Sequence, residues 1–408
     1  MRDGAIPRPL FVAVVTETYP PEVNGVARTI GVMVRLLRGR AHRVEVIRPR
    51  QGRGDVAAQD QTYAELLRPG LPIPKYGELR LGLPAKRALL ARWREARPDV
   101  VQVVTEGPLG WTAVTAARKL GIPVVSEFHT NFHTYSRHYG LGALSGAVAS
   151  YLRSLHNRSD CTLVPTDELA QTLAAVGYRE LRVVGRGIDT ELFSPARRSV
   201  ALRARWGCLG DEPVAIHVGR LAPEKGLDLF VAAALAARQA DPRTRIVLVG
   251  DGPAGRALRT RHPDFVYAGM RHGTDLAAHY ASADLMLFPS TTETFGNVTT
   301  EALASGLAVS AFDYAAARQH IRHEVSGLLA APGDRQAFIA NAARLAAQPA
   351  LRTRLGAAAA AVGATLSWHR IVDELEQVFR DLIDRHRRRP SPAPGIAPRP
   401  ARNDRAAS

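Results

Sequence analysis

Short apolar runs that alternate with helical segments limit most strongly what this chain can fold into. Because the runs are apolar throughout, they predict strands buried on both faces, which is typical of parallel sheets covered by helices. The alternation occurs in two sets, separated by an irregular stretch at 189–205. The sequence therefore predicts an α/β protein with two doubly wound parallel sheets. The expected strands are 11–15, 44–47, 100–104, 123–127, 161–164, 181–184, 214–218, 246–249, 265–267, 285–288 and 307–312.

The irregular stretch marks the expected boundary between two domains. We assign residues 1–190 to an amino-terminal domain and residues 191–367 to a carboxy-terminal domain, which suits a chain of 408 residues. A long helix at 368–388 is expected to pack back on the first domain. Residues 389–408 are basic, rich in proline and poor in large apolar side chains. They predict a disordered tail.

Two segments of the first domain deviate from the alternation. Residues 50–82 are rich in glycine, proline and charge, and they predict a long irregular loop. Residues 84–97 have helical spacing, and Pro84 suits the first position of the helix. The apolar face of this helix carries Leu89 and Trp93, and its opposite face carries arginines. Such a helix could rest on an anionic membrane. The alternative is a helix that covers a sheet and exposes its charged face.

The net charge of +16 suggests an anionic partner. Nucleic acid, an acidic membrane surface and a phosphorylated substrate all fit this charge, and so does a general preference for arginine along the chain. Nucleic acid is disfavoured because no stacking aromatics alternate with the basic residues. A phosphorylated substrate and an anionic membrane surface remain open as partners, and the oligomeric state is undetermined.

The two cysteines fit a reducing compartment. Cys161 and Cys208 lie in different predicted domains and no CxxC motif occurs, so neither a disulfide framework nor a structural zinc is expected. The first ten residues lack the apolar core of a signal peptide. The apolar runs at 10–15 and 141–152 are too short to span a bilayer. We expect a cytoplasmic protein, either soluble or peripheral on the inner face of the membrane.

The stretch 288–306 carries the strongest functional signal. It runs from the end of a buried strand through a polar loop into a helix, and Glu293 and Glu301 lie on either side of the turn. Between them, Phe295, Gly296 and Asn297 place backbone N–H groups at a helix start, where anionic or hydroxyl-rich ligands bind. This stretch predicts a site for a molecule that carries both phosphate and hydroxyl groups.

Two cations follow the first strand of the second domain. The strand that ends at Val218 leads into Gly219 and Arg220, and Lys225 comes five residues later. Ligands of open α/β sheets bind where strands end, and arginine and lysine in one loop can both reach a diphosphate. Taken alone, the pair is better explained as a solvated basic loop. Together with the two glutamates, the cations indicate a diphosphate site.

A glycine motif after the strand at 246–249 suggests a dinucleotide site only weakly. Gly250, Gly252 and Gly255 match GxGxxG, but the next strand ends in Ala-Gly-Met, without the acidic residue that would hold a ribose. An NAD-dependent oxidoreductase is therefore a weak alternative. No GxxxxGK[ST] occurs, so a P-loop NTPase is weaker still.

Histidines follow the strand at 123–127. His129 stands at the carboxyl end of that strand, where ligands bind. His129 and His133 could ligate a metal together if they were helical, but no third ligand follows at motif spacing and no Asp-x-Asp motif occurs. We expect no metal. We favour His129 as a hydrogen-bonding residue of the active site and His133 as an outer or packing residue.

These motifs together resemble the retaining GT-B glycosyltransferases of the group 1 and family 4 type. The resemblance rests on Gly219-Arg220 with Lys225-Gly226, on Gly250-Asp251-Gly252-Pro253, and on the two glutamates eight residues apart with Phe295-Gly296 between them. It covers about residues 10–388. The segments TETYPPEVNGVART and FHTNFHTYSRHYG look most like the bacterial GDP-mannose-dependent α-mannosyltransferases.

The resemblance implies two Rossmann-like domains that face each other across a cleft, with a nucleotide-sugar as substrate and no cofactor. Arg220 and Lys225 would bind the donor diphosphate, Glu301 the ribose, and Glu293 the sugar hydroxyls. The remaining residues of the implied donor site are Gly25, whose backbone the diphosphate would approach, Gly252, Met270 beside the base, the amides of Phe295, Gly296 and Asn297, and His129 near the reacting carbon.

The resemblance also implies a reaction. A hexose, best taken as mannose from GDP-mannose, would move to an acceptor such as a membrane glycolipid. We expect Glu293 to orient the sugar and not to attack it, with the departing phosphate helping to deprotonate the acceptor. A UDP-sugar-dependent transferase or a sugar-nucleotide epimerase of the same fold are the alternatives. A phosphorylase is disfavoured because no lysine besides Lys225 stands at an evident site for pyridoxal phosphate.

Overall fold

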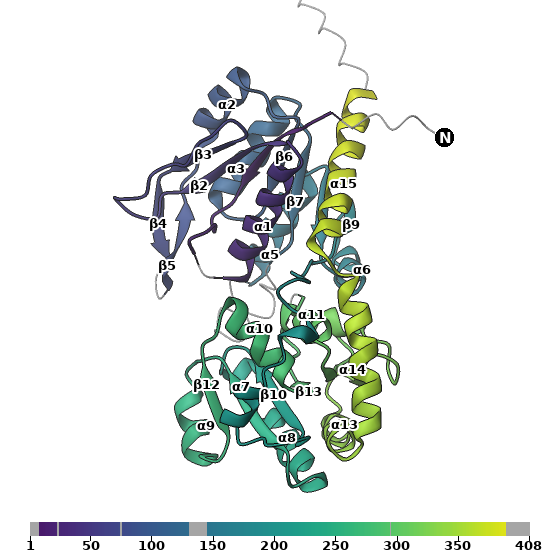
Figure 1. The fold of residues 1–408 in the computed structure, drawn as a ribbon. Helices are drawn as coiled ribbons and strands as arrows, with labels where there is room; N and C mark the ends of the chain where they lie inside the picture. The colour runs from purple at the N-terminus through teal and green to yellow at the C-terminus, as the bar shows by residue number, and fades with distance from the viewer. Residues whose placement is uncertain (1–7, 23, 74–75, 130–144, 294, 389–408) are drawn as a thin grey trace, which may run out of the picture.

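The computed structural model describes residues 8–22, 24–73, 76–129, 145–293 and 295–388, which form two lobes (Figure 1). In the first lobe the described strands form a seven-stranded parallel sheet in the order β3-β2-β1-β6-β7-β8-β9. Because successive side chains of a buried strand point to opposite faces of the sheet, each strand contributes side chains to two hydrophobic cores. The bounds are β1 Phe11–Val15, β2 Arg43–Pro49, β3 Tyr63–Arg68, β6 Val100–Val103, β7 Val124–Glu127, β8 Cys161–Val164 and β9 Leu181–Val183.

The helices of the first lobe divide between the two faces of this sheet. Val12 and Val14 pack in one core with α1, whereas Ala13 and Val15 pack in the other with α2 and α3. Asn24 caps α1, since its Oδ1 accepts a hydrogen bond from the amide of Ala27. The bounds are α1 Gly25–Gly39, α2 Lys86–Glu95, α3 Pro108–Lys119, α5 Ser145–Arg158 and α6 Asp167–Ala175.

The second lobe repeats the arrangement. Its described strands form a six-stranded parallel sheet in the order β12-β11-β10-β13-β14-β15. They are β10 Val214–Val218, β11 Arg245–Val249, β12 Val266–Gly269, β13 Leu285–Phe288, β14 Ala308–Phe312 and β15 Leu328–Ala330. The helices are α7 Val200–Arg205, α8 Leu227–Ala240, α9 Gly255–Arg261, α10 Gly273–Ser282, α11 Asn297–Ala304, α12 Ala315–His320, α13 Arg335–Ala347 and α14 Pro349–Ala364.

Helix α15, Trp368–Arg388, returns from the second lobe to the first (Figure 1). Its buried stripe, which includes Ile371, Leu375 and Phe379, lies in the same core as Val12 and Ile30. The long apolar stripe explains why a carboxy-terminal helix completes the amino-terminal lobe. The predicted tail at 389–408 lies outside the described residues.

The prediction of an irregular loop at 50–82 is wrong. The segment contains strand β3 at the edge of the first sheet and an antiparallel hairpin, β4 Gly70–Ile73 and β5 Tyr76–Gly82. Edge strands carry charge and tolerate proline, because one side of their backbone is unpaired. Pro72 and the half-buried polar residues of β3 therefore concealed strands that a search for buried runs cannot find.

Helix α2 begins at Lys86 and not at Pro84 as predicted. Its apolar face is not available to a membrane, because Leu89 and Trp93 are 0% and 1% exposed in the core beneath the helix. The amphipathic pattern therefore belongs to a helix that covers a sheet. Among the residues that the structure describes, no helix is both long and apolar enough to cross a bilayer.

Candidate active site

The carboxyl ends of the two sheets face each other, and an ion pair between Arg28 and Glu301 joins them. Arg28, in the first turns of α1 after β1, places its Nη1 3.3 Å from Oε1 of Glu301 in α11 after β13. Glu301 is one of the two glutamates that the sequence singled out, whereas Arg28 was missed. The contact brings the first-domain loop after β1 to the predicted ribose site of the second domain.

Glu301 is buried and held from two sides. Its Oε2 accepts a hydrogen bond of 2.9 Å from the hydroxyl of Tyr280, and Tyr280 packs edge-on against Phe193 with ring centroids 5.7 Å apart. Burial raises the pKa of Glu301, although Arg28 and Tyr280 oppose that shift. The result is a fixed carboxylate that still faces the first domain.

Glu293 contacts one of the predicted diphosphate-binding cations. Nζ of Lys225 lies 2.5 Å from Oε1 of Glu293, and the hydroxyl of Ser290 donates to the same oxygen at 2.7 Å. Tyr314 holds the loop from below by donating to the backbone carbonyl of Glu293 at 2.8 Å. The structure therefore places Lys225 and Glu293 side by side, as a site that binds a sugar next to a phosphate requires.

Arg220 lies at the margin of this group. Its side chain is 54% exposed, and Nη1 lies 3.6 Å from Oε1 of Glu224 one turn further along the loop. No contact of Arg220 with Glu293 is seen among the described residues. Arg220 thus lies in the predicted loop and is accessible, but it does not contact Glu293 in the described structure.

The start of α11 is open in the way that the sequence predicts. Gly296 has a φ of 93°, a left-handed conformation that favours glycine, and no side chain caps the helix that begins at Asn297. Phe295 is 4% exposed and its carbonyl accepts the amide of Ala316 at 2.8 Å. Phe295 therefore anchors the turn, and no side-chain acceptor for the first amides of α11 is seen in the described part of the chain.

The glycine motif has a structural cause within the fold. A Cβ at Gly250 would lie 2.0 Å from the carbonyl oxygen of Gly219, and one at Gly252 would lie 2.5 Å from that of Leu221. The loops after β10 and β11 therefore pack backbone against backbone. Donor binding by Gly252 stays a prediction, as does that by Met270, which follows β12 and is 57% exposed.

Gly25 occupies an open position. It is the first residue of α1, it is exposed, and no atom lies within 4 Å of where its Cβ would be. Nothing in the described part of the chain therefore obstructs the approach of a ligand to this backbone segment.

His129 is paired with charged neighbours from its own domain. Its Nε2 lies 2.5 Å from Oε2 of Glu127, and its Nδ1 meets Nη2 of Arg186 from the loop after β9. His129 was predicted, whereas its two partners were missed. His133 lies outside the described residues. Among those that are described, no group of three or more His, Cys, Asp or Glu side chains could hold a metal.

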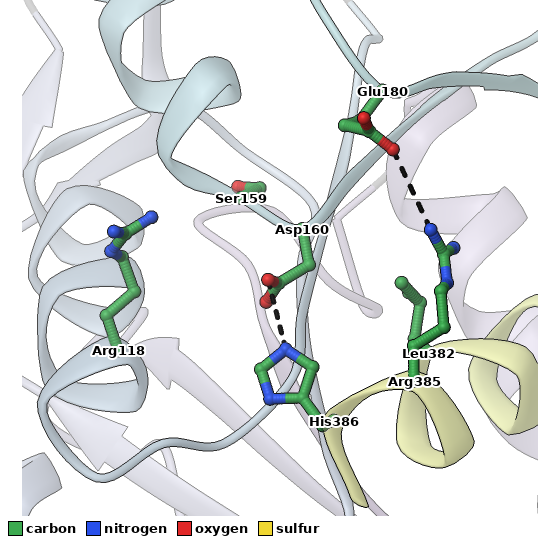
Figure 2. Close-up of a pocket in the computed structure, with 7 residues that line it drawn as sticks. All are labelled: Arg118, Ser159, Asp160, Glu180, Leu382, Arg385 and His386. Atoms are coloured by element: carbon green, nitrogen blue, oxygen red, sulfur yellow. Dashed lines mark ion pairs between the residues drawn. The ribbon is translucent and has the colours of Figure 1, made fainter. Parts of the chain in front are cut away.

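Figure 2 shows a cavity of about 330 Å³ at the opposite, amino edge of the first sheet. Its lining includes Arg118 and two ion pairs, Asp160 with His386 and Glu180 with Arg385. None of the predicted site residues line it. The cavity is a polar gap beneath the last turns of α15, remote from the paired carboxyl ends.

The residues that sequence reasoning missed share one property, which is that they act through other side chains. Tyr280 and Arg28 hold Glu301, Ser290 holds Glu293, and Glu127 and Arg186 hold His129. The strand-end position of Ser290 and Glu127 was the only available signal, because the other three come from segments far away in the chain.

The fold has two doubly wound parallel domains whose carboxyl ends meet. A basic loop, two glutamates and an open helix start lie where they meet. This combination defines the GT-B class of glycosyltransferases. Residues 23–192 match the model of glycosyltransferase family 4, and residues 212–348 match that of the glycosyl transferases group 1. The chain belongs to this family and is a hexosyltransferase.

Curated relatives agree with this assignment. A GDP-mannose-dependent alpha-mannosyltransferase of Mycobacterium tuberculosis (strain CDC 1551 / Oshkosh) is 35% identical over 89% of this chain and 94% of its own length. The enzyme of the same name from Corynebacterium glutamicum is 31% identical over 92% and 90%. The predicted resemblance is confirmed.

Solved structures confirm the predicted fold. Sucrose-phosphate synthase from Thermosynechococcus elongatus matches with a TM-score of 0.73 at 18% identity, over 92% of this chain and 100% of that one. WaaG, a glycosyltransferase involved in lipopolysaccharide biosynthesis, matches with a TM-score of 0.67 at 17% identity, over 90% and 99%.

Proposed function

We propose that this glycosyltransferase moves mannose from GDP-mannose to a hydroxyl group of a glycolipid, with retention of the anomeric configuration. The observation that carries the donor site is the contact between Lys225 and Glu293, with Glu301 fixed nearby by Tyr280. One cation for phosphate and two carboxylates for hydroxyls are the groups that a nucleotide-sugar needs. The names of the relatives at 31–35% identity support GDP-mannose as the donor.

In the proposed reaction the protein stabilises the leaving diphosphate. Lys225 and the accessible Arg220 bind its negative charge, which grows as the bond to the sugar breaks. Glu301 accepts hydrogen bonds from the ribose, and Glu293 and the first amides of α11 orient the sugar. The departing phosphate takes the proton of the attacking acceptor hydroxyl on the same face of the sugar. Glu293 carries no covalent intermediate in this scheme.

The lipid acceptor is proposed from other relatives. An alpha-monoglucosyldiacylglycerol synthase of Acholeplasma laidlawii is 28% identical over 73% of this chain and 79% of its own length. Contact with a membrane would be electrostatic, because the apolar face of α2 is buried while Arg87 and Arg94 are exposed. Co-sedimentation with anionic but not with zwitterionic vesicles is expected, and equal binding to both would contradict it.

A binding panel tests the donor. GDP, UDP and ADP are titrated into the protein by calorimetry, and thermal melting is followed with each. At a concentration a hundredfold above its dissociation constant, the correct nucleotide should stabilise the fold by about 2.7 kcal/mol. A response to GDP supports the proposal, and a response to UDP favours a UDP-sugar transferase. The absence of a response to any nucleotide would contradict the proposed donor site.

A transfer assay tests the reaction. GDP-mannose is incubated with the protein and vesicles that contain diacylglycerol and its monoglycosylated form, and the anomer of any product is read by NMR. An α-linked product from the α-linked donor demonstrates retention. A β-linked product, or a mannosyl group trapped on Glu293 by mass spectrometry, would overturn the proposed mechanism.

A further inference from the structure

His129 lies between two charged side chains of its own domain, Glu127 and Arg186. Glu127 is the last residue of β7, His129 follows two residues later, and Arg186 reaches the imidazole from the loop after β9. The side chains of Glu127 and His129 are 6% and 1% exposed. Gln102 on the neighbouring strand β6 donates to Oε1, the other carboxylate oxygen of Glu127. The carboxylate of Glu127 therefore lies between the amide of Gln102 and the imidazole of His129, and the guanidinium of Arg186 faces the other ring nitrogen.

The chemistry of the neighbours determines where the imidazole proton lies. A guanidinium group only donates hydrogen bonds, so the Nδ1 atom that faces Arg186 must present its lone pair. The single proton of a neutral imidazole then belongs to Nε2, which lies 2.5 Å from an oxygen of Glu127. The negative charge of this carboxylate favours a proton on Nε2, through an ion-pair contact and not through a hydrogen bond of regular geometry. The two partners thus favour the same tautomer from opposite sides.

We propose that Arg186 and Glu127 are positioning residues that hold His129 as the neutral Nε2–H imidazole, with each ring nitrogen facing one of these two charged groups before any donor binds. This inference rests on the proposed function, because it assigns a task to His129 in that site. His129 then meets the donor sugar as an oriented, uncharged surface. It is not a proton carrier, since neither nitrogen is available to substrate.

Electrostatics supports this arrangement. One carboxylate and one guanidinium compensate each other across a neutral ring, whereas a protonated ring would put a second cation beside Arg186. Burial, reinforced by the charge of Arg186, lowers the pKa of His129, although Glu127 and the more distant Glu106 oppose the shift. A neutral ring is therefore the state that the surroundings favour.

Nitrogen NMR of the wild-type protein tests the tautomer directly. The chain contains 13 histidines, so ¹⁵N-histidine labelling is combined with His129→Gln, whose missing signals identify those of His129. A protonated Nε2 and an unprotonated Nδ1 at pH 7 are expected. A protonated Nδ1, or protonation of both nitrogens, would overturn the proposal whether or not the protein transfers sugar.

Variants of Arg186 test the link to function. Arg186→Met removes the donor to Nδ1, so His129 should lose its fixed tautomer, while His156, which pairs through Nδ1 with Ser126 Oγ at 2.9 Å, keeps its signals as an internal control. The kcat for transfer should fall between about tenfold and a hundredfold with little change in KM. Arg186→Lys, which still donates, should restore part of kcat and the tautomer.

The two proposals fail in different ways. If the wild-type protein shows the expected tautomer but transfers no sugar from any nucleotide-sugar, the proposed function falls and the arrangement of His129 stands. If Arg186→Met shifts the tautomer while kcat is unchanged, the positioning role falls and the transferase proposal stands. If Arg186→Met does not fold, the wild-type spectrum and Arg186→Lys still decide the tautomer.

Discussion

Glu301 shows how one residue can link the two domains and the donor. Its carboxylate is buried, which is costly unless hydrogen bonds compensate for the lost water. Tyr280 and Arg28 supply that compensation, one from its own domain and one from the other. In the proposed donor site a ribose hydroxyl would share this carboxylate with Arg28, which would couple donor binding to the contact between the domains.

Removing the hydroxyl of Tyr280 should weaken nucleotide binding. Tyr280→Phe deletes the 2.9 Å hydrogen bond to Oε2 of Glu301 and leaves the ring in its packed place. Hydrogen bonds to charged groups contribute about 1.5–3 kcal/mol, so the dissociation constant for GDP should rise about tenfold or more. Calorimetry measures it. Tyr178→Phe, in the buried aromatic cluster of the first domain, serves as the control, and an unchanged constant for Tyr280→Phe would contradict the role.

Glu17, in the loop after β1, should make stability depend on pH. Burial, with a smaller contribution from Glu106, raises its pKa from 4.5 to about 7. Between these values the folded chain holds a proton that the unfolded chain has lost, so stability falls as the pH rises from 4.5 to 7. Each pH unit between the two pKa values changes the unfolding free energy by about 1.4 kcal/mol. The total loss of stability across this range is therefore about 3 kcal/mol at most.

Glu17→Gln isolates this effect because it removes the charge and keeps the shape. The difference in unfolding free energy between the variant and the wild type should favour the variant more at pH 8 than at pH 5. Chemical denaturation at both pH values measures it. Glu95→Gln, at an exposed position of α2, should show no such difference. Denaturation curves in which the wild type and Glu17→Gln differ equally at pH 5 and pH 8 would contradict the pKa assigned to Glu17.

At the scale of elements, the loops after β10 and β11 form one backbone-packed unit. Leu221 N–H donates to the carbonyl of Asp251 at 2.9 Å, and Gly219 N–H donates to that of Val249 at 3.0 Å. Side chains would separate these loops, which is why glycine is required at Gly250 and Gly252. The loop that carries Arg220 and Lys225 thus owes its position to a motif that resembles a dinucleotide fingerprint.

Gly250→Ala should therefore destabilise the fold itself. Its φ of 133° is strained for alanine, and the new Cβ would overlap the carbonyl oxygen of Gly219. A loss of about 2–4 kcal/mol in unfolding free energy is expected. Gly25→Ala is the matched control, since its Cβ meets nothing within 4 Å. It should melt like the wild type and yet transfer less sugar, because the donor diphosphate approaches that backbone. Equal melting of both variants would contradict the packing argument.

Strand burial decides how much of the fold the sequence reveals. Strands such as 11–15 and 285–288 were predicted at their observed bounds because every residue is apolar and lies between two layers of helices. Strand β3 escaped because an edge strand is only half buried, and its residues are mostly partly exposed. The short strand β15 and helix α12 were also missed, because each contains too few residues to show a clear hydrophobic pattern.

At the scale of the whole molecule, the site residues that sequence reasoning found are those on motifs, such as Glu293 and Lys225. Arg28 lies 273 residues from Glu301, and Arg186 lies 57 residues from His129. Their pairing depends on how the two domains face each other and on the order of β7, β8 and β9 in the sheet. Neither property is encoded in local spacing, so no motif could have revealed these contacts.

The domains are also joined at the rim of the site by Glu168 in the first turn of α6. Its Oε1 lies 3.0 Å from Nη1 of Arg318, and its Oε2 accepts the amide of Ala315 at 3.2 Å, both in or beside α12. The chain crosses between the lobes twice, and the two crossings pair at Ile188 and Ser367. The contact of Glu168 with α12 therefore adds to the ion pair of Arg28 with Glu301 in holding the two lobes together.

Glu168→Ala should loosen the arrangement of the domains without unfolding either. Arg318 is 50% exposed, so the contact is worth about 1 kcal/mol at most, which changes a two-state population about fivefold. Small-angle scattering should show a larger radius of gyration than for the wild type, while thermal melting changes little. Asp167→Ala removes the same charge from the same turn of α6, and no contact with α12 is seen for Asp167 in the described structure, so it should scatter like the wild type. Identical scattering from Glu168→Ala and Asp167→Ala would show that this contact does not hold the lobes together.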